Sequence, residues 1–211
     1  TQLGPFEGKV QETPLVGAQR LRECAWDACT KFAIPKDWVS GVYLGKLSST
    51  KHRYQSYVVF IVRDDRSADF LFQCSDNTWQ AYNAWPDLYS LYHNDRPDRL
   101  VLVSGVKVSF DRPYGKYVQI YDNPLSQGSG EFLLWEFPLA YWLEQHGYDV
   151  TYCSNVDVLE PANLSRSKTF LSVGHDEYWD ERQYFNVKQS IANGMHALWL
   201  GGNAVFAVSP Y

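Results

Sequence analysis

The pattern of hydrophobic and polar residues divides the chain into two halves. Between residues 31 and 65, apolar positions alternate with polar ones, and Val, Tyr, Phe and Ile are frequent. A period of two with these residue types predicts antiparallel strands, and we expect a small β-sandwich-like unit. The charged segment "RDDRSAD" (63–69) then breaks the pattern. It predicts a boundary between a β-rich unit, residues 1–65, and a second domain, residues 66–211.

The second half alternates between short apolar runs and longer segments with helical character. The runs at 70–74, 107–110, 149–153, 168–174 and 196–200 predict strands. The segment 131–147 predicts a helix with Pro138 near its first turn, and 180–194 predicts a helix capped by Asp180 and stopped at Gly194. Strand–helix–strand repeats of this length imply right-handed crossovers. We therefore predict an α/β domain with a mostly parallel sheet flanked by helices.

Composition limits the possible partners of the chain. Its 211 residues are 45% hydrophobic, enough for a sizeable core, and the net charge is −5. This charge argues against nucleic acid and anionic membranes as partners, since both attract clustered Lys and Arg. No apolar run approaches the length of about 20 residues that spans a bilayer. The four cysteines form no CxxC pair and are expected to be buried thiols.

The two ends of the sequence suggest a piece of a longer chain. The first residue is Thr, no secretory pattern follows, and the last residue comes shortly after an apolar strand. We expect both units to be incomplete, the α/β domain at its C-terminal end, and we expect the protein to be cytoplasmic.

Polar residues follow three of the predicted strands. They are residues 75–83, 174–177 and 201–203. If the strands are parallel, these ends lie at one edge of the sheet, where ligands bind in open α/β folds. Gly174, Gly201 and Gly202 would let a ligand approach the backbone, and Asn203 offers a donor and an acceptor. Helix capping and a simple turn are alternative explanations for each motif taken alone, but their combination favours a site.

His175 and Glu177 are the ionisable pair in this region. Being two residues apart, they point to one side of an extended segment, and could share a metal or supply one ligand and one proton carrier. The chain has neither G-x-S-x-G nor HExxH, which argues against acyl-enzyme chemistry and common zinc hydrolases. Tyrosine is abundant, and tyrosinate binding requires a strongly acidic cation, because the phenol pKa is about 10. Ferric iron is the natural candidate. A metal-free hydrolase using His175 as base and Glu177 to orient it is an alternative.

Five motifs carry a resemblance to a known family. They are "TWQAYN" (78–83), "VSFDRPY" (108–114), "EFLLWEFPLAYWLEQHGYDVTYC" (131–153), "LSVGHDEYW" (171–179) and "LWLGGN" (198–203). In this order they resemble the large subunit of N,N-dimethylformamidase and its relatives, over nearly the whole chain. The resemblance implies a flavodoxin-like, glutamine-amidotransferase-like α/β domain preceded by the end of a β-sandwich-like unit. It also implies an amidohydrolase that cleaves a small formamide to formate and an amine, with one iron held by two tyrosines and a glutamate.

The family's site residues are carried over only where a motif matches. Glu177 of "GHDEYW" corresponds to the glutamate ligand, and His175 and Asn203 correspond to polar groups beside the metal. Tyr82 of "AYN" corresponds to one tyrosine ligand and Tyr114 of "DRPY" to the other, with Tyr117 and Tyr121 as alternatives to Tyr114. The resemblance further implies a small amide substrate, a possible homo-oligomer and a small accessory subunit.

One departure from the family affects this interpretation. Relatives follow "AYN" with Trp and a Gly-Gly pair, whereas this chain reads "AYNAWPDLYSLY" (81–92). Pro86 and the residues Asp87 and Leu88 form a stiffer, acidic stretch next to Tyr82. This leaves the substrate open. It also leaves open a second class of function, a catalytically silent binding or assembly module that keeps the fold and uses an aromatic cleft for recognition.

Overall fold

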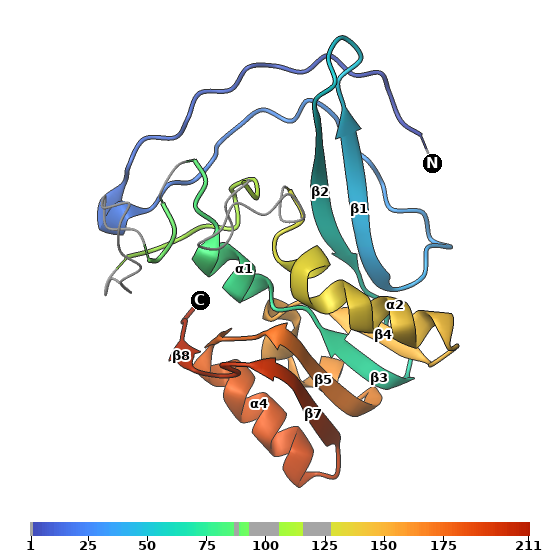
Figure 1. Ribbon diagram of the computed structural model, residues 1–211. Helices are drawn as coiled ribbons and strands as arrows, with labels where there is room; N and C mark the ends of the chain where they lie inside the picture. The colour runs from blue at the N-terminus through green and yellow to red at the C-terminus, as the bar shows by residue number, and fades with distance from the viewer. Residues whose placement is uncertain (1, 87–88, 93–105, 116–127) are drawn as a thin grey trace.

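A four-stranded parallel sheet forms the centre of the computed structural model, which describes residues 2–86, 89–92, 106–115 and 128–211 (Figure 1). Its strands are β3 (Ala68–Gln73), β4 (Val150–Cys153), β5 (Ser167–His175) and β7 (His196–Gly202), in the spatial order β4-β3-β5-β7. All three pairings are parallel, as predicted. The chain adds β4 on one side of β3 and then β5 and β7 on the other, which is the flavodoxin-like strand order.

Helices cover both faces of this sheet. Alternate side chains of each strand face opposite sides, so the apolar strands supply two cores. One core lies under α1 (Asp76–Tyr82) and α2 (Phe137–Gln145) and contains Phe72, Trp79, Leu143, Tyr152 and Val173. The other lies under α3 (Pro161–Leu164) and α4 (Glu181–Ala192) and contains Leu71, Val158, Leu164, Phe170 and Val187. The predicted α/β class is therefore confirmed.

The helix boundaries agree with the sequence signals. Asp180 caps α4, its side chain accepting a hydrogen bond from Arg182 N at 2.7 Å, and α4 ends at Ala192, two residues before Gly194. Pro138 occupies the first turn of α2. Before α2 the chain makes one π-type turn, η3 (Phe132–Glu136), and after β4 it makes a 3₁₀ turn, η4 (Val156–Leu159).

The β-rich unit is an antiparallel hairpin, β1 (Gly41–Ser48) and β2 (Gln55–Val62), in register from Gly41↔Val62 to Ser48↔Gln55. Val59 and Ile61 pack against the core under α1 and α2. Within the described residues this hairpin takes the place of the expected sandwich. Residues 31–38 form no strand, because Pro35 interrupts the alternating pattern and cannot donate to a ladder. Near the N-terminus the chain has only a 3₁₀ turn, η1 (Ala18–Arg20).

The predicted strand at 107–110 is wrong. Residues 106–110 have no regular secondary structure apart from a bend. Their segment lies beside the irregular N-terminal part of the chain, with Lys107 N donating to Gln19 O and Cys24 N donating to Asp111 O. A β-strand needs an extended neighbour to form a ladder, and this neighbour is not one.

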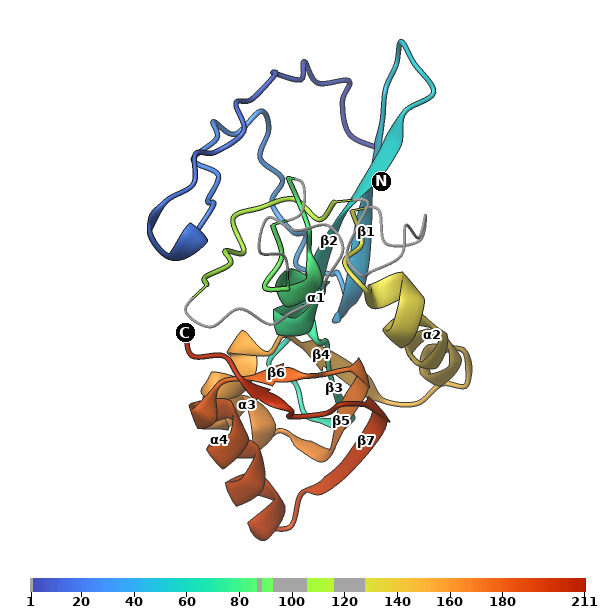
Figure 2. The same cartoon turned by 60° about the vertical axis from the view of Figure 1, so that its left-hand side comes forward.

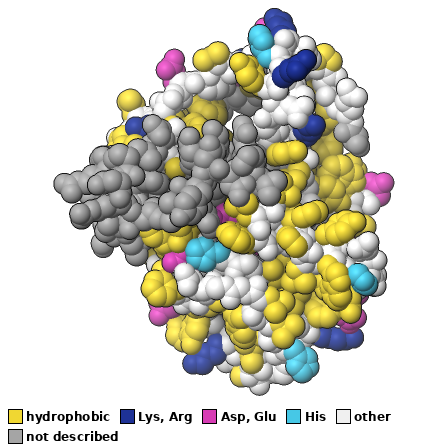
Figure 3. Space-filling model, viewed as in Figure 1, with side chains coloured by type: hydrophobic (Ala, Val, Ile, Leu, Met, Phe, Trp, Pro, Cys, Tyr) yellow, Lys and Arg dark blue, Asp and Glu magenta, His cyan; other side chains and the backbone are white. Residues whose placement is uncertain are grey.

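The far end of the sheet leaves apolar side chains exposed. β7 is an edge strand, and exposed hydrophobic residues gather over β7 and α2 (Figure 3); they include Trp135, Phe137, Trp142, Leu198, Trp199 and Leu200. Two short strands, β6 (Tyr178–Trp179) and β8 (Ala207–Val208), pair in parallel beneath α1 (Figure 2). Among the helices that the structure describes, none has the length and apolar character needed to cross a bilayer.

Candidate active site

The predicted strand ends meet at the carboxyl edge of the sheet. Gln73 of β3 is in register with Ser172 of β5, and His175 of β5 is in register with Gly202 of β7. The order of the strands reverses between β3 and β5, so their carboxyl ends flank the switch point where such sheets bind ligands. α1 follows β3 at this point, and residues 176–179 follow β5. The candidate site is built from these two segments.

Two glycines at this edge, Gly174 and Gly201, serve packing between strands and helices. Gly174 has φ +75, and a Cβ there would lie 2.8 Å from Trp135 Cβ. A Cβ on Gly201 would lie 1.5 Å from Gly174 O. Gly174 and Gly201 therefore let β5 approach β7 and η3 closely. The sequence suggested that Gly174, Gly201 and Gly202 admit a ligand, but the protein itself approaches Gly174 and Gly201, and only Gly202 has open space at its Cβ position.

Four side chains converge on the carboxylate of Glu177 or on its partners. Tyr82 Oη donates to Glu177 Oε2 at 2.7 Å, and Tyr92 Oη lies 3.2 Å from each carboxylate oxygen. His175 Nε2 lies 3.1 Å from Glu177 Oε2. This contact does not have the geometry of a hydrogen bond, and it is an ion pair when the imidazole is protonated. The Tyr178 hydroxyl is hydrogen-bonded to that of Tyr92.

Ring packing holds these groups in place. The rings of Tyr82 and Tyr92 stack with centroids 4.4 Å apart, and the His175 ring lies 5.2 Å from that of Tyr82. The side chain of Glu177 is 5% exposed and that of His175 is 19% exposed. The carboxylate is thus sealed by aromatic rings, whereas the imidazole remains within reach of solvent.

The charge on Glu177 is stabilised by its neighbours. Burial alone would raise the pKa of the Glu177 carboxyl, but its contacts with His175, Tyr82 and Tyr92 outweigh burial and lower this pKa below its usual value. Burial raises the pKa values of Tyr82, Tyr92 and Tyr178 above that of free tyrosine. The protein alone therefore presents a carboxylate surrounded by neutral phenols.

Asp176, the preceding residue, faces the other way. Successive side chains of an extended segment alternate, so Asp176 enters the core while Glu177 faces α1. Its carboxylate accepts hydrogen bonds from Gln73 Nε2 at 2.6 Å, Ser172 Oγ at 2.7 Å and Asn155 Nδ2 at 3.2 Å. Burial raises the pKa of Asp176 to about 6. These bonds fix the backbone from which Glu177 projects.

Arg112 of the "DRPY" motif organises the segment after α1. Its buried guanidinium donates to Gln80 O at 3.1 Å, to Trp85 O at 2.7 Å and to Asn83 O at 3.2 Å. Asn83 Nδ2 in turn donates to Pro113 O at 2.9 Å. The motifs "AYN" and "DRPY" therefore meet in space, and they do so through backbone carbonyls. A further bond, from Leu91 N to Ala81 O at 2.9 Å, brings Tyr92 beside Tyr82.

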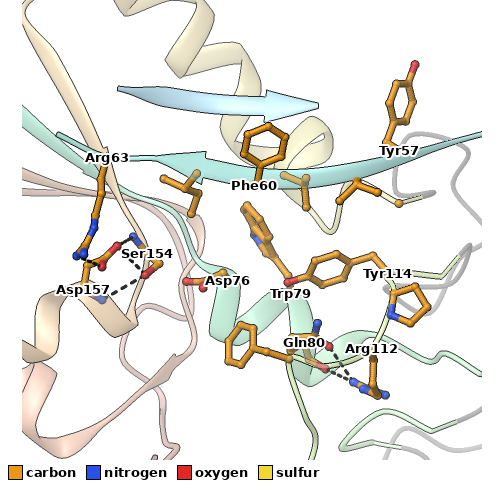
Figure 4. A pocket seen from close by; sticks show the side chains of 16 residues that line it. Tyr57, Phe60, Arg63, Asp76, Trp79, Gln80, Arg112, Tyr114, Ser154 and Asp157 are labelled. Atoms are coloured by element: carbon orange, nitrogen blue, oxygen red, sulfur yellow. Dashed lines mark hydrogen bonds and ion pairs between the residues drawn. The ribbon is translucent and has the colours of Figure 1, made fainter. Parts of the chain in front are cut away.

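Tyr114 lies apart from Glu177. Its ring packs edge-on against Trp79, with centroids 6.1 Å apart. Burial raises its pKa well above the usual value. Tyr114 lines a cavity of about 580 Å³ between β2 and α1, together with Asp76, Trp79 and Gln80 (Figure 4). Tyr82, Tyr92, His175 and Glu177 do not line this cavity. The two alternatives to Tyr114, Tyr117 and Tyr121, lie outside the described residues.

Asn203 follows β7 in an exposed turn. Its φ of +53 is in the left-handed region, which Asn tolerates better than most residues. The pairing of His175 with Gly202 places the Asn203 backbone one residue beyond the end of the β5–β7 ladder. The structure thus brings together His175, Glu177 and Tyr82, places Asn203 at the same edge, and leaves Tyr114 on another face of α1.

Three residues of this cluster, Tyr92, Tyr178 and Thr78, were not predicted from the sequence. Tyr178 is part of the quoted motif "GHDEYW" and Thr78 opens "TWQAYN". Thr78 Oγ1 accepts hydrogen bonds from Glu177 N and Tyr178 N. Tyr92 is ten residues after Tyr82, beyond a helix end, and no periodicity relates them. The sequence signal for these three residues was their position: Thr78 and Tyr178 lie inside the quoted motifs, and Tyr92 lies near one of them.

Oxygen atoms are the donors that this cluster offers to a cation. Among the described residues, no group of three or more His, Cys, Asp and Glu side chains is arranged to hold a metal ion. Phenol and carboxylate together make a different donor set. The oxygens of Tyr82 and Tyr92 lie 2.7 and 3.2 Å from Glu177 Oε2. Both spacings are those of hydrogen bonds to one carboxylate, and a hard cation in place of the phenol protons would meet three oxygen donors.

Fold and site together define a doubly wound α/β protein with a tyrosine–glutamate site at the carboxyl edge of its sheet. The family model for N,N-dimethylformamidase beta subunit-like proteins, C-terminal region, matches residues 1–210. The chain belongs to this family, which confirms the resemblance seen in the motifs. The name of the family points to a dimethylformamidase-type hydrolase and, through "beta subunit", to an assembly of more than one kind of subunit. A search of curated proteins gives no match.

Proposed function

We propose that this chain carries the active site of an amidohydrolase that cleaves a small N-substituted formamide to formate and an amine. We further propose that one ferric ion is held by Glu177, Tyr82 and a second tyrosine. The observation that supports this most is the approach of Tyr82 Oη and Tyr92 Oη to one carboxylate, at 2.7 and 3.2 Å from Glu177 Oε2. The geometry favours Tyr92 as the second tyrosine, and Tyr114 remains the candidate from the motif.

The chemistry of the donor set agrees with a hard, highly charged cation. Carboxylate and phenolate are hard oxygen ligands, and a phenol with a raised pKa gives up its proton only to a strong Lewis acid. When bound, such an ion would polarise the amide carbonyl and acidify a water. A dialkylated amide has no N–H and a strongly delocalised carbonyl, so its hydrolysis needs this kind of assistance.

His175 is the proposed proton carrier. Its Nε2 is buried beside the Glu177 carboxylate, whereas the side chain as a whole is 19% exposed. In this proposal His175 accepts a proton from the attacking water and returns it to the nitrogen of the departing amine. The Glu177 carboxylate orients the imidazole through the contact at 3.1 Å.

Asn203 and the aromatic side chains complete the proposal. Asn203 would donate its amide N–H to the oxygen that becomes negative during attack, a contact worth roughly 3 kcal/mol in hydrolases where it has been tested. The rings of Tyr82, Tyr92 and Tyr178 enclose the carboxylate and would exclude bulk water from a small substrate. Association with a second copy and with a small accessory subunit is also part of this proposal.

Metal content and visible absorption of the purified protein test the proposal. We expect one iron per chain and a tyrosinate-to-iron charge-transfer band, both lost in Tyr82→Phe and in Glu177→Ala. Formate and amine released from N,N-dimethylformamide provide the second readout. Folded protein without iron or colour, after growth with iron, would exclude the metal-based mechanism. Activity that survives chelation and Tyr82→Phe would instead favour metal-free catalysis by His175 and Glu177.

The aromatic cavity favours a second candidate function, a binding module without catalysis. The rings of Trp79 and Tyr114 line the cavity beside α1, whereas those of Tyr57 and Phe60 lie on the far side of β2 (Figure 4). Aromatic walls with a few polar groups are typical of sites that recognise small molecules. This candidate predicts ligand-dependent stabilisation without iron and without turnover, so the same metal measurement separates it from the first.

A further inference from the structure

Thr78 connects α1 to the segment that carries Glu177. It is fully buried in the middle of α1. Its Oγ1 accepts a hydrogen bond from Glu177 N at 3.0 Å and another from Tyr178 N at 3.3 Å. A threonine hydroxyl has two acceptor positions, so one oxygen can serve both donors. These contacts join residues about one hundred positions apart in the chain.

The same helix holds Glu177 a second time, one turn later. Thr78 and Tyr82 are four residues apart and therefore share a face of α1. Thr78 binds the backbone of Glu177, and Tyr82 binds its carboxylate at 2.7 Å. Asn77 adds a third attachment, from its Nδ2 to Tyr178 O at 3.0 Å. Helix α1 thus holds both the backbone and the side chain of Glu177 in place.

Among the described residues, Thr78 takes the place of a neighbouring strand on one side of this segment. The carbonyls of Glu177 and Trp179 accept hydrogen bonds from Ala207 N and Ser209 N, on the β8 side of the segment. The N–H groups of Glu177 and Tyr178 face α1 and use the threonine hydroxyl instead. Without that hydroxyl, two buried donors would lack their partner, and each such loss costs about 1–3 kcal/mol. The segment would then shift or twist to find water.

We infer that Thr78 is a positioning residue that sets the spacing between the Tyr82 hydroxyl and the Glu177 carboxylate, and so the geometry of the proposed iron site. The inference rests on the proposed function, in which Tyr82 and Glu177 bind one ion. Thr78 itself touches neither substrate nor ion. Groups that orient metal ligands in this way typically change metal affinity about 10- to 100-fold when they are removed.

The test compares Thr78→Val, which keeps the shape and loses the hydroxyl, with Thr78→Ser, which keeps the hydroxyl. Thr151→Val is the matched control, because Thr151 is also buried and its hydroxyl donates to Asp64 Oδ1 at 2.8 Å, on β4 rather than at the site. Measurements are ferric-ion affinity, the position and intensity of the visible band, and melting temperature. We expect Thr78→Val to lose about 10- to 100-fold in iron affinity and to shift the band.

The variants distinguish positioning from stability. Thr78→Ser should restore affinity and band to nearly those of the wild type, and Thr151→Val should lower the melting temperature and leave both unchanged. If Thr78→Val lowers only the melting temperature, as the control does, the inference is wrong. If the wild type binds no iron, the proposed function fails. The positioning role of Thr78 is then tested by crystal structures of the metal-free wild type and Thr78→Val. A Tyr82–Glu177 contact kept at wild-type length in Thr78→Val would overturn the inference, and a lengthened contact would support it.

Discussion

Each of the two faces of α1 lies beside a carboxylate, and the pKa values of these two carboxyl groups are shifted in opposite directions. Thr78 and Tyr82 face Glu177, where phenol donors and His175 lower the carboxyl pKa. Asp76, Trp79 and Gln80 face the cavity under β2. There, burial and, to a smaller extent, the nearby carboxylates of Asp157 and Asp176 raise the pKa of Asp76 to about 7. One helix of seven residues thus separates a carboxylate held in its charged form from one that is half neutral at physiological pH.

The difference lies in the hydrogen-bond donors that surround each carboxylate. Glu177 has several donors aimed at its oxygens, so it is ionised before any cation arrives. Asp76 accepts from Asn155 N at 2.7 Å, but lacks a comparable set of donors from phenols and imidazole. Aromatic lining occurs on both faces. The organised donors around the carboxylate, more than the volume of a cavity, therefore identify the candidate active site.

The largest expected effect comes from removing the carboxylate of the first face. Glu177→Gln should abolish iron binding and lower amide hydrolysis by at least about 10³-fold, because the metal and its polarising charge are lost. Metal analysis and a formate assay measure this. Glu181→Gln, an exposed change at the start of α4, is the control and should retain both. Full activity in Glu177→Gln would remove the basis for calling this face the active site.

A large loss of stability is expected from Arg112→Met. The side chain is 6% exposed and its guanidinium binds several backbone carbonyls after α1. Leaving these buried acceptors unpaired should lower the free energy of unfolding by at least about 3 kcal/mol. Urea denaturation measures the change. Arg53→Met, at an exposed position of the hairpin turn, should stay within about 0.5 kcal/mol of the wild type. Similar values for the two variants would contradict the organising role of Arg112.

Paired tyrosine variants sharpen the comparison between the faces. Tyr92→Phe should weaken iron binding about 10- to 100-fold and reduce the charge-transfer band, because Tyr92 Oη lies 3.2 Å from both Glu177 oxygens. Tyr114→Phe removes a hydroxyl on the cavity side, and its band should keep the wild-type intensity. Titration with ferric ion followed by absorption measures both. The reverse outcome would assign the second ligand to Tyr114 and require the "DRPY" segment to move to the other face.

The smallest effect is a pH dependence from Asp76. Its folded-state pKa of about 7 exceeds the ordinary value of 3.8, so between these values the folded protein binds more protons than the unfolded one. Stability therefore falls as pH rises from about 4 to about 7. One proton contributes at most about 1.4 kcal/mol per pH unit, and less here because the carboxyl is only partly buried. Asp176 contributes with the same sign.

Asp76→Asn keeps an acceptor for Asn155 N and should flatten this slope in urea denaturation at several pH values. Asp37→Asn, an exposed change before the hairpin, should leave the slope as in the wild type. If the pH dependence of the free energy of unfolding is unchanged in Asp76→Asn, the Asp76 carboxyl is better solvated than its burial indicates.

The parallel sheet and the edge at which its polar strand ends meet could be predicted, because each rests on local pattern. Apolar runs of strand length, Asp180 as a helix cap and Gly-rich strand ends are all visible along the chain. Parallel connection then requires strand ends such as His175 and Gly202 to share one edge. The strand expected at 107–110 failed for the opposite reason, because a strand depends on a partner that local sequence does not reveal.

By itself, the sequence determined the α/β class and the edge of the sheet that carries polar groups, because these follow from period and order. Only the tertiary structure decided which tyrosines reach the carboxylate. Tyr92 reaches it through the bond from Leu91 N to Ala81 O and the clamp of Arg112 on the segment after α1, and Tyr114 is turned against Trp79. With fifteen tyrosines in the chain, identity alone cannot select among them. The selection depends on long-range hydrogen bonds that exist only in the folded protein.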